Sequence, residues 1–469
     1  MTGRVQGATP RIRIAFALFA LNAFVTLPWA LANWGASPAG ILILGGWLAL
    51  AALMVPIARG QLAGQFFWAG LAAILILSRL AAHGLVDGAA TTGDPEIYEK
   101  IARSLIAGEG LVFHDPLTGV DFRAMYPPLY PLLIAGLGSA FGLGAGTYLG
   151  LNIAIDLGSA VLVAAIGARL GSAPAGRAAA WLFAIWPAFI MSTPFAQKES
   201  LVLLEVLGLV LVLLRMEKGR LAAWWEGAAF GALWASLMLT QPGLAVLPAL
   251  LGLFLLPAAG WRALFRLGLV AAPFALLLML PWWVRNYQLL GSFVPLTTTS
   301  GIGLWIGNNP DATGGWVPMP ASYQGMPEVE MSRRAGREAV QWIGAHPLDF
   351  IKLTLFKLFK AMGIEQFNLA RLNLLRPVPA DAVFAAYFPV LQGSLLAVLA
   401  GTALLLQRVW ALARGQRLIL VLLACAVQIL VFSLPFEFGE RHRYFLMPFL
   451  FLAVAAGFAS RENAKEAGP

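Results

Sequence analysis

Two acidic side chains stand where long apolar segments end, at positions that meet a membrane surface. Asp94 opens the polar segment GDPEIYEKIARSLIAGEGL directly after the third apolar run, and Glu199 follows a later one. Because a charge beside lipid is costly, acids at such places are candidates for function. Asp94 has a structural interpretation as well, since an Asp before Pro95 and Glu96 suits the N-cap of a helix. The two roles are compatible, because a carboxylate at a helix start can still face a cavity.

Basic side chains gather at the ends of other apolar runs. The segment EFGERHRY, residues 437–444, places Arg441 and Arg443 together, and fork-shaped guanidinium groups match phosphate oxygens. The alternative is an internal network, because neighbouring Glu and Arg side chains often pair with each other. Lys198 and Glu199 form a pair of opposite charges at a span boundary, and such a pair is more often an interfacial anchor than a catalytic element, since lysine reaches readily from apolar segments to water. Arg285 closes the run PWWVRN, where it could simply meet lipid headgroups.

A base and several cations on one face suit the transfer of a group from a phosphate donor. The leaving phosphate departs as an anion, so the enzyme needs cations for it and one base for the incoming hydroxyl. A glycosidase would instead need two carboxylates flanking one bond. The histidines at 83, 114, 346 and 442 are scattered without ligand spacing and do not indicate zinc. These residues predict transfer from a lipid-linked phosphate donor.

Composition places this chemistry in a membrane protein. Of 469 residues, 59% are hydrophobic and 12% are charged, and several stretches reach the roughly 20 apolar residues that cross a bilayer. The net charge of +9 does not indicate nucleic acid, because Arg and Lys occur singly or in pairs between apolar runs. Such spacing instead sets topology through positive cytoplasmic loops. The single cysteine, Cys425, lies inside an apolar run, which excludes a disulfide framework and a thiolate metal site.

The order of apolar runs and basic loops predicts an all-α membrane protein of about twelve transmembrane helices with both termini cytoplasmic. The spans are expected at about residues 14–33, 39–58, 65–86, 148–168, 178–196, 200–214, 222–239, 244–258, 267–284, 384–407, 418–435 and 445–460. Basic residues that include Arg4, Arg59 and Lys218 mark the inner loops. The first span is expected to remain as an anchor, because Asn33-Trp34 follows it instead of a small-residue cleavage site.

Two apolar segments are expected to lie in the outer interface without crossing. Residues 128–141 are too few for a span, and residues 348–360 carry Asp349, Lys352, Lys357 and Lys360 on one helical stripe. With these two left out, the acids and cations described above fall on one outer face. The predicted divisions are N-terminal transmembrane helices (1–86), a first outer loop with interfacial helices (87–147), a transmembrane core (148–284), an outer-face segment with an amphipathic helix (285–381) and C-terminal transmembrane helices (382–469).

The first outer loop also has a familiar pattern. GDPEIYEKIARSLIAGEGL with RAMYPPLYPLLIAGLG resembles the corresponding loop of the GT-C superfamily of integral-membrane glycosyltransferases, above all its protein mannosyltransferase, aminoarabinose transferase and Rgt-like group. The matching positions are Asp94, Tyr98, Ala102, Gly108, Gly110, Arg123 and Tyr126-Pro127-Pro128. PWWVRNYQLLGSFVPLTTTSGIGLWIGNNP and ERHRYFLMPFLFLAVAAG resemble the mid-chain and final segments of the same group.

This resemblance implies an inverting glycosyltransferase that moves a sugar from a polyprenyl-phosphate donor to a lipid, glycan or protein acceptor. It implies a multi-pass protein of the bacterial inner (plasma) membrane with its active site on the periplasmic side. Asp94 would be the general base, and Glu199 would lie near the second acidic position of the family. The other implied roles are donor-phosphate binding by Lys198, Arg285, Arg441 and Arg443, and loop support by Tyr98, Arg123 and Tyr126.

Two departures from the family pattern leave points open. Two extra spans precede the catalytic loop, and the second acidic position is Lys-Glu instead of an acidic pair, so no cofactor is certain and a divalent metal remains possible. The alternatives are a transporter or flippase of lipid-linked sugars, for which a dozen spans is also common, and a polysaccharide ligase or polymerase. A non-catalytic assembly subunit is a further alternative. It predicts that the acids and arginines are dispensable.

Overall fold

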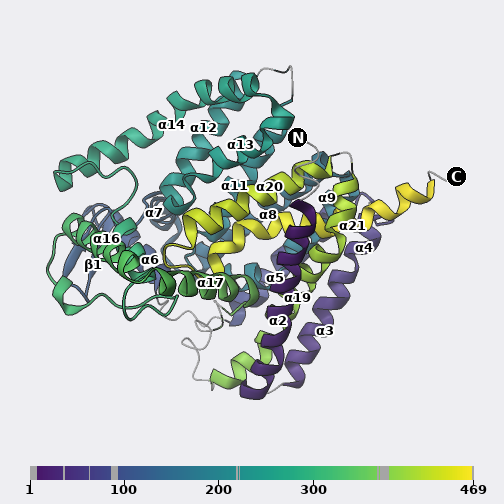
Figure 1. Ribbon diagram of the computed structural model, residues 1–469, viewed down its shortest axis with the longest axis horizontal. Helices are drawn as coiled ribbons and strands as arrows, with labels where there is room; N and C mark the ends of the chain where they lie inside the picture. Colours follow the sequence, from purple (N-terminus) through teal and green to yellow (C-terminus); the bar gives the residue numbers. More distant parts are fainter. Residues whose placement is uncertain are drawn as a thin grey trace.

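The computed structural model describes residues 8–34, 37–62, 64–85, 93–217, 220, 222–366, 369, 380–412 and 414–466. Arg4 and Lys218, which the topology prediction uses, lie outside these residues, as does the predicted boundary at 86–87. The regular secondary structure of the described chain is helical except for one hairpin, in which β1 (Phe113–Asp115) pairs antiparallel with β2 (Val120–Phe122) (Figure 1). This confirms the predicted all-α, multi-pass membrane class.

Among the described residues, nine helical segments are long and apolar enough to cross a bilayer, and each coincides with a predicted span. They comprise α2 (Ala8–Trp34), α3 (Pro38–Ala52) with α4 (Met54–Ala58), α5 (Phe67–Leu85), α8 (Ala145–Leu170), η1 (Pro242–Leu244) with α13 (Leu247–Ala259), α14 (Trp261–Leu290), α19 (Ala380–Ala411), α20 (Gly415–Val427) with the π-helix η3 (Gln428–Ser433), and η4 (Glu440–Leu446) with α21 (Met447–Glu466).

The other three predicted spans hold shorter helices. Residues 178–196 are divided between α9 (Ala173–Ala184) and α10 (Pro187–Ser192), which part at Pro187, a residue without the N–H that would continue the helix. α11 (Glu199–Leu214) has 16 residues and α12 (Trp224–Thr240) has 17, fewer than the roughly 20 of a full crossing. A total of twelve crossings therefore stays a prediction.

Tight crossings in the helical core depend on glycine. A Cβ on Gly176 of α9 would lie 2.2 Å from the carbonyl oxygen of Ala164 in α8. A Cβ on Gly231 of α12 would lie equally close, 2.2 Å, to the carbonyl oxygen of Ala271 in α14. Small residues let membrane helices approach this closely and gain van der Waals packing. Beside this core, α19 packs along α2 and α3 (Figure 1).

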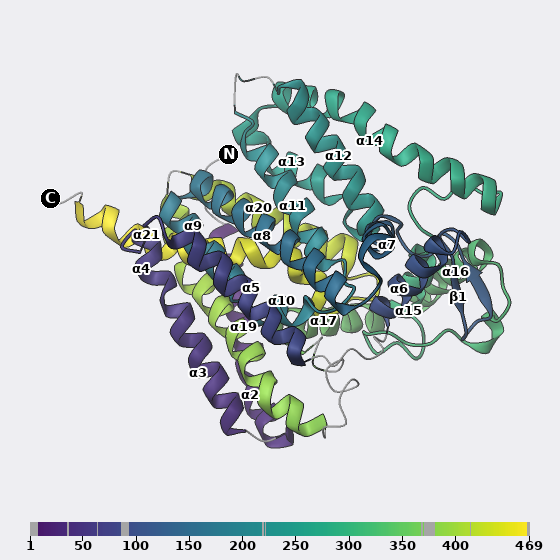
Figure 2. The same cartoon turned by 180° about the vertical axis from the view of Figure 1, so that it is seen from behind.

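The remaining elements gather at one end of the molecule. They are α6 (Asp94–Ile106), the hairpin, α7 (Leu129–Phe141), α15 (Thr299–Gly307), η2 (Ala321–Tyr323), α16 (Glu328–Ala345) and α17 (Pro347–Gly363). Both views place α6, β1 and α16 together at this end (Figures 1 and 2). α7 has 13 residues, a length that agrees with the expected non-crossing segment. α17 exposes Leu348, Ile351 and Phe356, as an interfacial helix would.

α6 packs between two apolar clusters, because apolar side chains lie on two of its sides. Ile101 is buried with Phe113 and Phe122 of the hairpin, in a cluster that continues into α15 and α16. Tyr98 and Ala102 are buried in a second cluster against α7 and α8. The start of α6, which carries Asp94, is therefore held between the hairpin, α15 and α16 on one side and α7 and α8 on the other.

Candidate active site

Asp94 is the first residue of α6, and the residue before it determines how the chain enters the helix. Gly93 occupies the N-cap with φ of +69°, a left-handed conformation that glycine adopts without strain. Asp94 therefore lies in the first turn, which corrects the N-cap interpretation by one residue. A carboxylate there is favoured by the positive end of the helix dipole.

One guanidinium group links the two acids that the sequence singles out. Nη1 of Arg441, in η4, contacts Oδ2 of Asp94 and lies 3.6 Å from Oε1 of Glu199, the first residue of α11. The exposed fractions of the three side chains are 17%, 23% and 12% for Arg441, Asp94 and Glu199, so the group is mostly shielded and still reachable from solvent. The fold thus unites residues from three distant parts of the chain.

Lys198 and an aromatic cluster complete this group. The Lys198 ammonium lies 5.7 Å from the ring centre of Tyr98, within the range of a cation–π contact. Burial lowers the pKa of Lys198, against the opposing fields of Asp94 and Glu199. The Tyr98 ring meets Tyr126 and Tyr130 edge to face, with ring centres 5.9 and 5.5 Å apart. The predicted supports Tyr98 and Tyr126 therefore lie directly beside the charged group.

Glu437 is a further acid near this group, to which the sequence analysis gave no separate role. Burial raises its pKa, whereas the positive charge of Arg441 opposes that shift. Asp94 and Lys360 also act on Glu437 electrostatically, so acids and cations interleave around Arg441. The only signal in the sequence was membership of the 437–444 segment, because neither its burial nor its neighbours follow from spacing.

Arg285 and Arg123 hold the part of the predicted first outer loop that lies between α6 and α7. Arg285 donates from Nη1 to the carbonyl oxygen of Arg123 (2.9 Å) and from Nη2 to that of Leu111 (2.8 Å). The backbone N–H of Arg123 donates in turn to Oε2 of Glu328 (3.0 Å), and that of Ala124 donates to Oε1 (3.1 Å). Glu328, the first residue of α16, thus secures the loop from the other side. Sequence reasoning missed it, because it looks like an ordinary helix-start acid.

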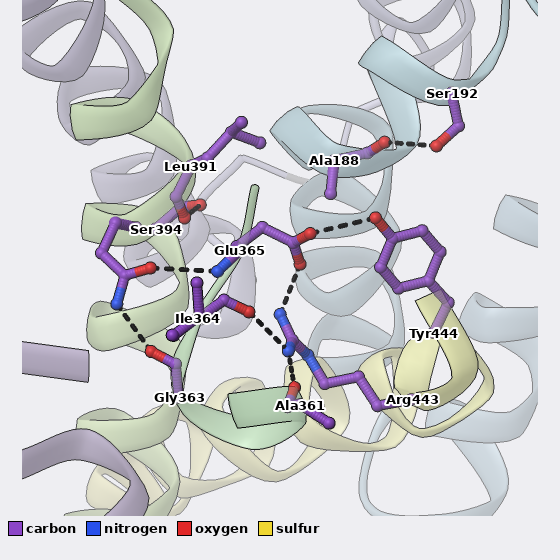
Figure 3. A network of polar contacts seen from close by, with 11 residues as sticks. Ala188, Ser192, Ala361, Gly363, Ile364, Glu365, Leu391, Ser394, Arg443 and Tyr444 are labelled. Atoms are coloured by element: carbon purple, nitrogen blue, oxygen red, sulfur yellow. Dashed lines mark hydrogen bonds and ion pairs between the residues drawn. The ribbon is translucent and has the colours of Figure 1, made fainter. Parts of the chain in front are cut away.

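Arg443 lies in a different environment from Arg441. It is fully buried, with Nη2 2.5 Å from Oε2 of Glu365 and Nη1 donating to the carbonyl oxygens of Ile364 and Ala361 (Figure 3). Tyr444 donates to the other oxygen of Glu365 at 3.0 Å. Residues two apart on a 3₁₀-helix such as η4 are about two-thirds of a turn apart, so they face different ways. In this structure Arg443 takes part in an internal network with Glu365 and two backbone carbonyl groups, and its role in phosphate binding stays a prediction.

The described residues contain no group of three or more His, Cys, Asp and Glu side chains that could hold a metal ion. Asp94 and Glu199 instead share Arg441, and a divalent cation between them would have to occupy the place of that guanidinium. The two carboxylates with Arg441 between them do not fit a metal ion. The proposed chemistry therefore uses the protein's own side chains.

No family model and no curated protein matches the sequence. Solved structures do match. The apo oligosaccharyltransferase of Archaeoglobus fulgidus is 13% identical, with a TM-score of 0.52 over 85% of this chain and 51% of that one. The fold is GT-C-like. This chain spans about half the length of that oligosaccharyltransferase, so the likeness concerns fold and not the whole protein's activity.

Two further matches have lower TM-scores. A complex of the archaeal oligosaccharyltransferase AglB from Archaeoglobus fulgidus with an inhibitory peptide and a dolichol-phosphate is 15% identical, with a TM-score of 0.49 over 85% of this chain and 50% of that one. ArnT from Cupriavidus metallidurans bound to undecaprenyl phosphate is 15% identical, with a TM-score of 0.41 over 85% of this chain and 78% of that one. The GT-C-like fold confirms the family resemblance at the level of architecture.

Proposed function

We propose that this chain is a glycosyltransferase that moves a sugar from a polyprenyl-phosphate donor to the hydroxyl group of a lipid, glycan or protein acceptor. The observation that carries the proposal is Arg441, whose one guanidinium group contacts Asp94 and lies 3.6 Å from Glu199, beside Lys198. A GT-C-like fold supports it, since solved structures of this fold include one with a dolichol-phosphate and one with undecaprenyl phosphate. We place the site on the outer face of the membrane, as the charge bias of the loops predicts, and we propose a bacterial inner membrane because the family resemblance implies one.

The proposed chemistry assigns one role to each side chain. The acceptor hydroxyl gives its proton to a carboxylate oxygen of Asp94, and its oxygen forms a bond to the anomeric carbon of the sugar. The bond from that carbon to the phosphate oxygen breaks, and the electron pair leaves with polyprenyl phosphate. Arg441 and Lys198 stabilise the negative charge that develops there. Attack and departure on opposite sides of the carbon invert its configuration.

Glu199 has a supporting role in this proposal. Asp94 and the donor phosphate compete for the same guanidinium, so donor binding draws Arg441 away from the base. Glu199, at 3.6 Å, keeps the guanidinium close to the site while this happens. In this proposal Arg285 and Arg123 support the loop through the backbone contacts described above, and Arg443 secures its own segment through Glu365.

The test is sugar transfer by purified protein in lipid nanodiscs, with a panel of polyprenyl-phosphate sugars and identification of the product by mass spectrometry. Asp94→Asn removes the base but keeps the size of the side chain, and we expect transfer to fall by about 10²–10⁴-fold. Glu96→Gln is the matched control, since Glu96 lies in the same turn of α6 and pairs with the exposed Lys100. Full activity of Asp94→Asn would overturn the base assignment. Passage of an intact lipid-linked sugar across the bilayer, or growth of a polymer, would favour the alternatives instead.

A further inference from the structure

Lys357 is a buried lysine close to the candidate active site. Its side chain is completely shielded from solvent, on the side of α17 that faces the protein. Within the described chain, no carboxylate lies at ion-pair distance from its ammonium group. Instead Nζ donates to the carbonyl oxygens of Phe436 (3.0 Å) and Gly307 (3.4 Å). A buried cation without a carboxylate partner carries a desolvation cost, and such a residue calls for a functional explanation.

The two acceptors belong to segments that meet at the end of α15. Gly307 is the last residue of α15, where carbonyl groups lack helical partners and the helix dipole favours a cation. A Cβ on Gly307 would lie 2.6 Å from the carbonyl carbon of Phe436, so the two backbones are in direct contact. Asn308 donates to the carbonyl oxygens of Leu304 (2.9 Å) and Pro435 (2.5 Å). We name this place, made by Lys357, Gly307, Asn308 and residues 435–437, the α15 joint.

The α15 joint lies directly before the part of the chain that carries Arg441. The backbone N–H of Glu437 donates to the carbonyl oxygen of Gly303 (3.1 Å), which adds another bond to α15. Only residues 438–440 then separate the joint from Arg441, so a shift of the joint moves the guanidinium directly. Displacement of a catalytic group by about 1 Å can cost 10²-fold in rate.

We propose that Lys357 is a positioning residue for Arg441: its ammonium group fastens the segment that carries Arg441 to the end of α15. This rests on the proposed function, because Arg441 is there the cation shared by the base and the donor phosphate. Glu437, on the segment that Lys357 holds, acts on Lys357 electrostatically, and Lys360, on the same helix as Lys357, acts on Glu437. α15 contributes only backbone carbonyl groups to this contact.

The test uses Lys357→Met, which keeps most of the length of the side chain and removes the donor. We expect kcat for sugar transfer to fall by about 10- to 100-fold with little change in KM for the acceptor, because the site stays intact but Arg441 is misplaced. Hydrogen exchange of residues 434–443 should rise. The thermal midpoint should stay equal or increase, since an apolar residue replaces a buried cation without a carboxylate partner. A lysine that only stabilised the fold would give the opposite pattern, a lower midpoint with unchanged kcat per folded molecule.

Two further variants make the result decisive. Lys352→Met is the matched control on the same helix, where Lys352 is exposed and pairs with Asp349, and it should change neither kcat nor exchange. Gly307→Ala pushes apart the two backbones that meet in the α15 joint without removing a hydrogen-bond donor, and it should reproduce the loss of kcat. Unchanged exchange and unchanged kcat in Lys357→Met would overturn the proposal. If the wild-type protein transfers no sugar but the exchange of residues 434–443 responds as expected, the joint stands and the proposed function fails.

Discussion

Replacing Arg441 with glutamine removes the cation that two carboxylates share, and its effect can be estimated from the geometry. Unit charges 3.6 Å apart, the separation of Arg441 from Glu199, interact by about 4–5 kcal/mol at an effective dielectric constant of roughly 20. The three side chains are 12–23% exposed, so water screens part of this interaction. We therefore expect a loss of about 2–3 kcal/mol in transition-state stabilisation, which is roughly 30- to 150-fold in kcat/KM.

The assay is kcat/KM for sugar transfer in a double-mutant cycle with Asp94→Asn. If proton transfer to Asp94 and departure of the phosphate that Arg441 stabilises occur in one concerted step, the two residues act as a unit, and the double variant should be little worse than Asp94→Asn alone. Arg103→Gln is the control, since Arg103 makes an exposed pair with Glu99 on α6 and its loss should change the rate less than threefold. A loss below threefold for Arg441→Gln, or full additivity with Asp94→Asn, would refute this account of the site.

Three other predictions concern the scaffold. Glu328→Gln weakens two charge-assisted bonds to backbone N–H groups and should cost about 1–3 kcal/mol of stability, seen as a lower thermal midpoint and faster proteolysis of the outer loop. Gly176→Ala forces a methyl group against the backbone of α8 and should cost about 1–3 kcal/mol, whereas Gly146→Ala, with open space around it, should cost less in the same thermal measurement. Burial lowers the pKa of Lys357 from 10.5 to about 8, so between those values the unfolded chain holds a proton that the folded chain lacks. Stability relative to Lys357→Met should therefore rise with pH across that window, and a flat or falling difference in thermal midpoint would contradict the burial.

Charge bias and the length of the apolar runs predicted where the membrane helices lie, but they did not predict where a helix is interrupted. In the part of the chain that the structure describes, nine predicted spans coincide with helices of sufficient length, because a run of about 20 apolar residues has few other stable conformations in a bilayer. The run at 178–196 looked equally apolar, yet Pro187 divides it. Whether such divided helices cross depends on their tilt and on their packing against neighbours, which composition does not encode.

The candidate site illustrates the same limit at the level of side chains. Topology could place Asp94, Glu199, Arg441 and Arg443 on one face, since position relative to the bilayer follows from the spans. It could not say which way each side chain turns about its helix. Arg441 faces the two acids, whereas Arg443 faces Glu365, a residue 78 positions away in the chain. That divergence depends on the 3₁₀ geometry of η4 and on long-range packing, neither of which local spacing reports.

In the proposed reaction, Asp94 and the donor phosphate compete for the Arg441 guanidinium, and this competition sets the order of events. While Arg441 contacts Asp94, the carboxylate is screened and is a poorer acceptor for a proton, so an empty site is held inactive. A donor phosphate competes for the same fork of N–H groups, and its binding releases Asp94 at the moment when a sugar is present to be attacked. Hydrolysis of the donor by water should then depend on Asp94 as strongly as transfer does. A hydrolysis rate that survives Asp94→Asn while transfer is lost would separate the two steps and contradict this coupling.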